Sequence, residues 1–180
     1  MTQTNTMETE LLTKSQRIVI FGATGDLCKR KLIPALYQLW CKHLLPKDLL
    51  IVGASRREFT KQCWLEKLGD YPQEFCHWLD FVCCDLDCQE SLNKLHDESA
   101  DTTYFLSVPP ERYENAIINL KEAGFLDDPD HSRVVIEKPF GYDLESADHL
   151  QSVVQIRSRL CLHFHRGEFV NYLGYPNHNI

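Results

Sequence analysis

The chain has 180 residues and a formal net charge of −7 at pH 7, so it is long enough for one domain of ordinary size with a stable core. This acidic balance excludes the basic surface that nucleic acid and anionic membranes require of a partner. The first 16 residues lack an apolar core of signal-peptide length, and no stretch approaches the roughly 18 apolar residues of a membrane span, so we expect a cytoplasmic protein.

Elements in the first half of the chain begin after a polar lead. Residues 1–16 are rich in Thr and Glu and are expected to be disordered. The apolar run at 17–21 predicts the first strand. Pro34 lies inside the helix that follows, where it removes a backbone donor, so we expect a kink or a restart near Ile33. Residues 49–54 form a continuous apolar run that is typical of a strand buried on both faces.

The pattern then continues as alternating helices and strands. Amphipathic spacing predicts a helix over 58–78 that is broken near Pro72, and Gly124 is expected to stop a later helix. Further strands are expected at 81–84, 102–108 and 133–136, and further helices at 89–96, 111–123 and 144–154. This alternation predicts an α/β fold, a doubly wound, Rossmann-like and mostly parallel sheet, with a ligand at the carboxyl ends of the strands.

A glycine-spaced turn follows the first predicted strand and opens the first predicted helix. Gly22 permits a tight turn, and Gly25 lets the backbone approach a phosphate group at a helix N-terminus. The small Cys28 occupies the third, helix-packing position of the usual fingerprint. Taken alone, such a turn is more often ordinary structure, and the segments that follow strengthen the interpretation.

Five segments in order resemble the amino-terminal part of the glucose-6-phosphate dehydrogenase family. They are Gly22-Ala23-Thr24-Gly25-Asp26-Leu27, Lys31-Leu32-Ile33-Pro34-Ala35-Leu36-Tyr37, Val52-Gly53-Ala54-Ser55-Arg56, Phe105-Leu106-Ser107-Val108-Pro109-Pro110 and Val135-Ile136-Glu137-Lys138-Pro139-Phe140-Gly141-Tyr142-Asp143-Leu144. The resemblance covers about 17–154 and then stops. It implies an NADP-binding Rossmann domain at 17–154 from which the family's second, α+β substrate domain is absent.

The end of the second predicted strand bears on the choice of cofactor. Arg56, beside Arg57, stands roughly where an acidic residue holds the ribose of NAD in other Rossmann units. A guanidinium favours NADP because it can bind the 2′-phosphate in charge-assisted hydrogen bonds. A solvated basic pair is the alternative from composition alone, and the resemblance implies the phosphate-binding role.

The resemblance also implies roles for residues elsewhere in the chain. Lys138 follows a predicted strand and matches the family lysine that contacts both cofactor and sugar substrate, although such a lysine is commonly only a solvated charge. Asp26 could instead cap the first helix. The expected cofactor-binding residues are Gly22, Ala23, Thr24, Gly25, Asp26, Leu27, Arg56, Asp85, Leu86, Phe105 and Lys138, and the expected substrate-binding residue is Lys138.

Cysteine and histidine residues give no strong metal pattern. The chain has eight cysteines and no export signal, so reduced thiols are expected. Cys83, Cys84 and Cys88 lack the paired spacing of a zinc site. Cys161, His163 and His165 would share one face of an extended strand, but no fourth ligand is evident. We therefore expect no metal.

The tail at 155–180 has a different character and is expected to be divergent and poorly ordered. In the resembled family this region gives Arg-Ile-Asp-His-Tyr-Leu-Gly-Lys-Glu, whereas here only Tyr172-Leu173-Gly174 matches. An altered reading frame, an alternative transcript or a truncated gene would explain the break. Longer family members oligomerise, and the sequence does not reveal whether this chain does.

The function that the resemblance implies is NADP-dependent oxidation of glucose 6-phosphate at its C1 hydroxyl, giving the 6-phospho-lactone. The family's general base is a histidine of the second domain. No catalytic residue is therefore expected in this chain, and we expect it to be inactive alone. Two alternatives stay open: an NADP enzyme of the glucose-fructose oxidoreductase type, and a non-catalytic nucleotide-binding or partner-binding fragment.

Overall fold

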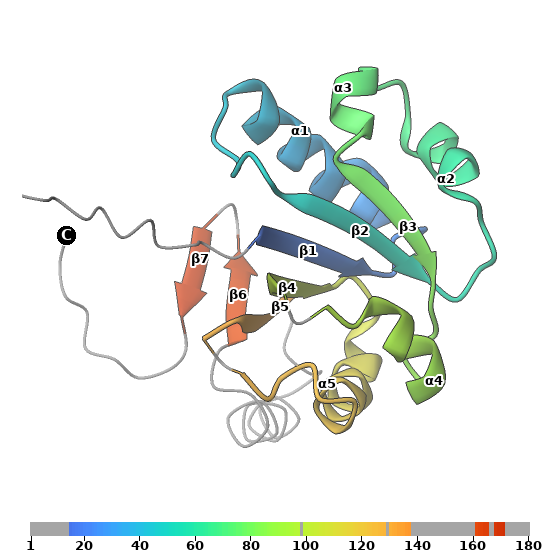
Figure 1. Cartoon of the computed structure of the whole chain (residues 1–180), viewed down its shortest axis with the longest axis vertical. Coiled ribbons are helices and arrows are strands. Elements are labelled where there is room, and N and C mark those ends of the chain that lie inside the picture. The colour runs from blue at the N-terminus through green and yellow to red at the C-terminus, as the bar shows by residue number, and fades with distance from the viewer. Residues whose placement is uncertain (1–14, 98, 129, 138–160, 166–167, 172–180) are drawn as a thin grey trace, which may run out of the picture.

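A computed structural model describes residues 15–97, 99–128, 130–137, 161–165 and 168–171 (Figure 1). Its centre is one seven-stranded sheet with the order β3-β2-β1-β4-β5-β6-β7. Every neighbouring pair is parallel except β6 and β7, which are antiparallel. The strands are β1 (Ser15–Phe21), β2 (Leu50–Ser55), β3 (Leu79–Cys83), β4 (Ala100–Leu106), β5 (Ser132–Glu137), β6 (Cys161–His165) and β7 (Glu168–Asn171).

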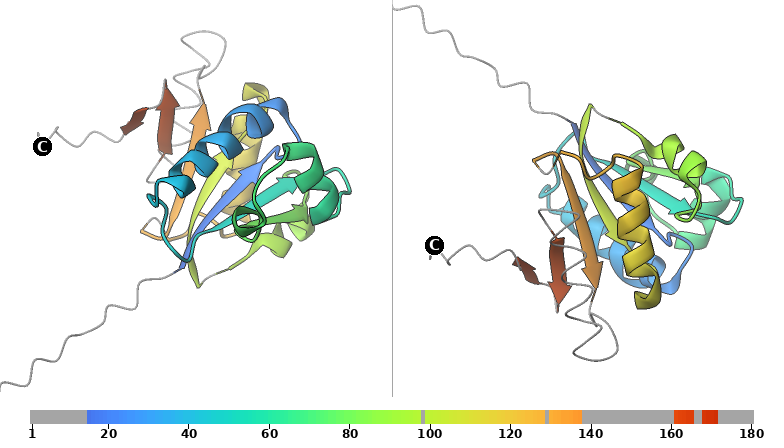
Figure 2. Two further views of the ribbon diagram at one scale, coloured as in Figure 1. Left: turned by 90° about the horizontal axis from the view of Figure 1, so that it is seen from above. Right: turned by 90° about the horizontal axis from the view of Figure 1, so that it is seen from below.

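Helices cover both faces of this sheet, which confirms the predicted doubly wound fold. The helical elements are η1 (Cys28–Leu32), α1 (Ile33–Cys41), α2 (Lys61–Leu68), α3 (Gln73–Cys76), α4 (Gln89–Leu92), η2 (Asn93–Leu95), η3 (Pro110–Arg112) and α5 (Tyr113–Glu122). Helices α1, α2 and α3 lie on one face, and α4 and α5 lie on the other (Figures 1 and 2). Two apolar cores result, because alternate residues of each strand point to opposite faces.

The central strand shows how this alternation divides the core. Ile20 packs toward α1, whereas Val19 and Phe21 pack toward α5. Val19, Ile20 and Phe21 are at most 1% exposed. A strand buried on both faces must be apolar at every position, which explains the continuous apolar run at the start of the domain.

The helix after β1 changes type where the proline predicts a restart. Residues Cys28–Leu32 form a π-helical turn, and α1 begins at Ile33 with Pro34 in its first turn. Proline tolerates the first turn of a helix, where its missing N–H is not required, and a π-turn absorbs the local misfit. The predicted restart near Ile33 is therefore confirmed.

The remaining helical predictions differ from the structure mainly in their ends. The predicted helix at 58–78 is two helices, α2 and α3, and Pro72 is the N-cap residue of α3. Thr60 starts α2 by accepting a hydrogen bond from the Cys63 N–H at 3.2 Å. The predicted helix at 89–96 is α4 followed by η2, and that at 111–123 is η3 followed by α5. The predicted helix at 144–154 lies outside the described residues.

Two strands in the tail were not expected from the sequence. The edge of β5 pairs with β6, and β6 pairs with β7 in an antiparallel hairpin. A free edge of a parallel sheet presents unpaired backbone groups, which a following segment with alternating apolar residues can satisfy. Leu162 and Phe164 supply that alternation, and it is the signal in the sequence that indicates a strand.

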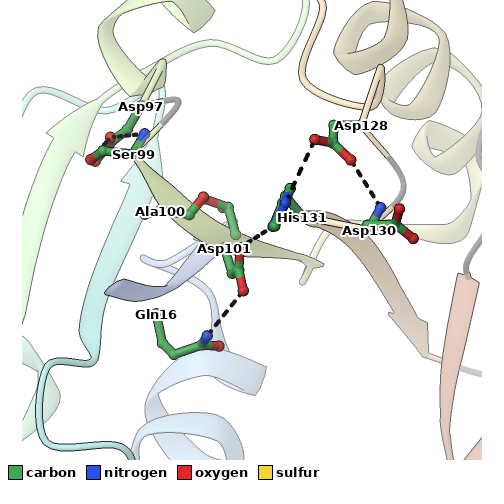
Figure 3. Close-up of polar contacts among 9 residues, drawn as sticks. Gln16, Asp97, Ser99, Ala100, Asp101, Asp128, Asp130 and His131 are labelled. Atoms are coloured by element: carbon green, nitrogen blue, oxygen red, sulfur yellow. Dashed lines mark hydrogen bonds and ion pairs between the residues drawn. The ribbon is translucent and has the colours of Figure 1, made fainter. Parts of the chain in front are cut away.

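At the amino ends of β4 and β5, polar side chains join three strands (Figure 3). The His131 ring contacts the Asp101 carboxylate and lies 3.9 Å from Asp128. Gln16 of β1 donates to Asp101 at 3.2 Å, and the Thr102 N–H donates to the His131 carbonyl at 2.8 Å. These bonds fix the edge of the sheet that lies opposite the carboxyl ends of its strands.

Within the described residues, every helix is too short or too polar to cross a bilayer.

Candidate functional site

The glycine turn after β1 lies against the carboxyl ends of β2 and β4. Gly22 has a φ of +81°, and a Cβ there would lie 2.1 Å from the Ser107 carbonyl oxygen. Only glycine fits such a position without strain. The Gly22 N–H donates to the Ala54 carbonyl at 2.9 Å, and the Gly25 N–H donates to the Gly22 carbonyl at 2.8 Å. The turn is thus fixed before any ligand binds.

Trp64 of α2 supports this turn from the core. Its indole N–H donates to the Ala23 carbonyl at 2.9 Å, and the side chain is 1% exposed. Its ring lies so close to Gly53 of β2 that a Cβ there would come within 2.6 Å of it. The absence of a side chain at Gly53 therefore leaves room for the Trp64 ring, and the Trp64 indole fixes the turn through its hydrogen bond to Ala23.

A cavity of about 320 Å³ opens above this turn at the carboxyl ends of four strands. It lies at the point where the strand order reverses around β1, which is where doubly wound sheets bind their ligands. Its lining comes from the segments that follow β1, β2, β3 and β4, namely Phe21, Gly22, Thr24, Gly25, Ala54, Ser55, Arg56, Arg57, Cys84, Asp85, Leu86, Ser107, Val108, Pro109 and Arg112.

Ser55 links the glycine turn to the arginines. Its hydroxyl lies 3.1 Å from the Thr24 hydroxyl and accepts a hydrogen bond from the Arg57 N–H at 3.3 Å. Ser55 is 8% exposed, so these bonds are made largely out of water. These hydrogen bonds therefore fix the backbone at Arg56 and Arg57 relative to the glycine turn.

The polar groups of the cavity suit an anionic ligand. Three arginines line it, Arg56, Arg57 and Arg112, against one carboxylate, that of Asp85. Ser107 also lines the cavity, and its buried hydroxyl oxygen has no hydrogen-bond partner among the described residues. An orphaned buried hydroxyl beside a cationic, glycine-lined loop fits a dinucleotide, whose phosphates and ribose hydroxyls would satisfy it.

The structure brings six of the predicted cofactor residues to this cavity: Gly22, Thr24, Gly25, Arg56, Asp85 and Leu86. Ala23 lies beneath the loop and is buried. Asp26 is exposed and pairs with Arg30 at 3.3 Å, and Leu27 packs against the core under α1. The helix start carries no side-chain capping hydrogen bond, so the expected cap by Asp26 is not seen.

One further predicted residue, Phe105, is not among the residues that line this cavity. Phe105 points to the α1 face and lines a separate apolar cavity with Leu36 and Leu39. Its strand position explains this, because residue 105 pairs in register with Ile20 and Val135 of the same face. Lys138, predicted to bind both cofactor and substrate, lies outside the described residues.

Sequence reasoning missed Arg112 and Trp64 as parts of the site. Arg112 follows the double proline after β4, and no pattern in the sequence indicates that it returns to the cavity. Trp64 shows only as an apolar position of an amphipathic helix. A hydrogen bond to a carbonyl 41 residues away leaves no local signal.

The seven cysteines between Cys28 and Cys88 are free thiols, and among the residues whose side chains the structure describes no group of His, Cys, Asp or Glu could hold a metal ion. Cys161, His163 and His165 all lie on β6. Burial raises the pKa of the Cys84 thiol at the cavity to about 11, so it is a neutral thiol near pH 7.

Comparison with known proteins identifies the family. The model of the glucose-6-phosphate dehydrogenase NAD-binding domain matches residues 19–159. The chain belongs to the glucose-6-phosphate dehydrogenase family. The match therefore favours this family over the glucose-fructose oxidoreductase type.

Curated relatives and solved structures agree with this assignment. Glucose-6-phosphate 1-dehydrogenase of Aggregatibacter actinomycetemcomitans is 36% identical over 155 residues, covering 74% of this chain and 31% of the relative. The enzyme of Schizosaccharomyces pombe is 31% identical over 157 residues, and the match covers 75% of this chain and 31% of the relative. The crystal structure from Mycobacterium avium superposes with a TM-score of 0.74 at 25% identity, covering 84% of this chain and 36% of that one.

This chain thus spans about a third of the length of the curated glucose-6-phosphate dehydrogenases that it matches. A second solved structure, described as glucose-6-phosphate dehydrogenase in complex with its substrate glucose-6-phosphate, has a TM-score of 0.73 at 26% identity and covers 85% of this chain. The matched part is the dinucleotide-binding domain of the family.

Proposed function

We propose that this domain binds NADP in preference to NAD. The observation that carries the proposal is the cavity above the glycine turn, where Arg56 and Arg57 follow β2. NAD-binding Rossmann units place a carboxylate near this position for the ribose hydroxyls, and an arginine suits a 2′-phosphate instead. Among the described residues that line the cavity, the one carboxylate, Asp85, follows β3.

Different residues of the cavity bind different parts of the nucleotide in this proposal. The amino end of the helix that begins after the turn attracts the pyrophosphate, and Gly25 leaves room for it. Arg56 takes the 2′-phosphate, and the Ser107 hydroxyl, which has no hydrogen-bond partner among the described residues, binds a polar group of the nucleotide. In the family reaction, bound NADP accepts a hydride from C1 of glucose 6-phosphate. Lys138 is the proposed contact to cofactor and sugar.

Titration of both nucleotides against wild type and Arg56→Ala tests the preference. A hydrogen bond to a charged group is worth about 1.5 to 3 kcal/mol, so Arg56→Ala should bind NADP roughly ten- to a hundredfold more weakly, with little change for NAD. Arg133→Ala, a matched change on β5 outside the cavity, should leave both affinities unchanged. Gly25→Val should abolish binding of both nucleotides while the circular dichroism stays that of the folded domain.

Equal NADP affinity of Arg56→Ala and wild type would contradict the role of this arginine. Normal binding by Gly25→Val would contradict the placement of the pyrophosphate.

A further inference from the structure

Arg112 reaches the cavity from an unexpected part of the chain. It is the last residue of η3 and lines the cavity, and its guanidinium pairs with Asp87 in the loop after β3. Asp87 is not among the lining residues. The arginine therefore borders the ligand space, its carboxylate partner lies outside the cavity lining, and the pair connects the segments after β3 and β4.

The wall around Arg112 is apolar and well fixed. Leu86, Val108 and Pro109 line the same cavity, and Leu86 is 6% exposed. Asn119 of α5 donates to the Leu86 carbonyl at 2.9 Å, and the Ser91 hydroxyl accepts a hydrogen bond from the Asp85 N–H at 3.0 Å. Such a wall suits a flat ring better than a phosphate, whose oxygens would find few donors there.

The placement of the other parts of the nucleotide leaves this wall to the base. The pyrophosphate is assigned to the turn after β1 and the 2′-phosphate to Arg56 after β2, so the adenine is left to the segments after β3 and β4. We propose that Arg112 binds the adenine of the nucleotide by stacking its guanidinium on the ring, and that Asp87 positions it. This inference rests on the proposed function and names a contact of the same site.

The chemistry of the pair supports stacking. A guanidinium is planar, and a carboxylate that bonds to its edge leaves its faces free for an aromatic ring. Cation–π stacking is strongest when the cation is partly desolvated, and the Arg112 side chain is 30% exposed. A lysine ammonium offers no such plane.

The test uses three probes that share adenine: NADP, NAD and AMP. Arg112→Ala should weaken binding of all three by a common factor of about three- to thirtyfold, whereas Arg56→Ala should weaken NADP alone. Arg112→Lys keeps the positive charge but loses the planar guanidinium, so its affinities for the three probes should resemble those of Arg112→Ala. Asp87→Asn should give a smaller common loss. Lys121→Ala breaks the ion pair between Lys121 of α5 and Asp127 in the segment after α5, away from the cavity, and should leave all three affinities unchanged.

Three outcomes with the Arg112 variants overturn the inference, and the wild-type affinities test the proposed function separately. Arg112→Ala with wild-type affinities excludes a contact, and a loss confined to NADP assigns Arg112 to the 2′-phosphate. Wild-type affinity of Arg112→Lys for the three probes would show that the positive charge is sufficient and that the guanidinium does not stack. Tight AMP binding by wild type without any preference for NADP refutes the proposed NADP preference while the Arg112 comparison stands, and a wild type that binds none of the three probes refutes both.

Discussion

At the scale of single residues, burial divides the cysteines into two chemical groups. Cys28 and Cys84 are at most 2% exposed, and burial raises their pKa values to about 12 and about 11. Cys41, Cys63 and Cys88 are exposed. Since the thiolate is the reactive form, a raised pKa and poor access act in the same direction.

We therefore expect iodoacetamide at pH 8 to alkylate Cys41, Cys63 and Cys88 in the folded protein and to spare Cys28 and Cys84. Peptide mass spectrometry after timed quenching measures each site, and the same reaction in urea is the control in which all five react. Alkylation of Cys84 at the rate of Cys88 would show that the cavity wall opens readily.

A second residue-scale effect concerns Asp97, which accepts hydrogen bonds from the hydroxyl and the N–H of Ser99 (Figure 3). The Ser99 hydroxyl is the largest cause of a pKa of Asp97 below its ordinary value of 3.8. A lowered carboxyl pKa means that the folded state favours the ionised form. The resulting stabilisation is present above about pH 4 and is lost as the pH falls through the folded-state pKa.

Ser99→Ala should therefore raise the pKa of Asp97 toward its ordinary value, as measured by NMR titration of the carboxyl carbon. The stability of this variant relative to wild type should fall most above pH 4 and converge with it at lower pH. An unchanged Asp97 titration in Ser99→Ala would assign the shift to other groups. The effect is small because Asp97 is exposed to solvent.

At the scale of elements, α2 holds the glycine turn through the single indole hydrogen bond of Trp64. Trp64→Phe keeps an aromatic ring in the core and removes the donor to the Ala23 carbonyl. We expect a loss of about 1 kcal/mol in the free energy of unfolding, together with weaker NADP binding, because a buried carbonyl is left without its partner. Urea unfolding and nucleotide titration on the same sample measure both effects.

Trp40→Phe is the matched control, since Trp40 packs against the same core from the later part of α1. It should leave nucleotide affinity unchanged. If both variants weaken NADP binding alike, the effect belongs to core packing and not to the hydrogen bond.

The sequence predicted the elements of the first 137 residues in the right order, because apolar runs and helical spacing are local signals. Their ends were less predictable. The turn at 69–72 that divides α2 from α3 depends on Gly69, with a φ of +134°, and on Pro72 as the N-cap residue of α3. The hairpin of β6 and β7 depends on the edge of β5, which is a property of the assembled sheet, and the alternation of Leu162 and Phe164 is its one local signal.

The sequence predicted the part of the candidate site in which the backbone conformation requires a particular residue type. Gly22 must be glycine because of its φ and its distance to Ser107, and such a requirement is visible in the sequence. Arg112 was not found because its place depends on how η3 turns back after β4 and on its pairing with Asp87. Phe105 was assigned to the cofactor by resemblance, and the alternation along β4 turns it to the other face.

At the scale of the whole molecule, the described site contains a nucleotide cavity and no assembled proton acceptor beside a sugar site. We expect the 180-residue chain to bind NADP without oxidising glucose 6-phosphate, because correctly placed general bases contribute about 10² to 10⁴ in rate. The assay follows absorbance at 340 nm with millimolar glucose 6-phosphate, on protein purified from a host that lacks its own enzyme. Turnover that persists through purification and disappears in Lys138→Ala would contradict this expectation.

The strand order sets the sequence of events during synthesis. Strand β1 is made first, and it lies inside the sheet between β2 and β4. One of its edges can pair once β2 has emerged, but the other pairs with β4, whose first residue lies 85 positions after the start of β1. An unpaired central strand exposes apolar side chains and backbone groups that invite aggregation. The nascent chain therefore carries its glycine turn unfinished until residues 100–106 leave the ribosome, so a turn that is made early becomes rigid only after a much later segment of the chain has been made.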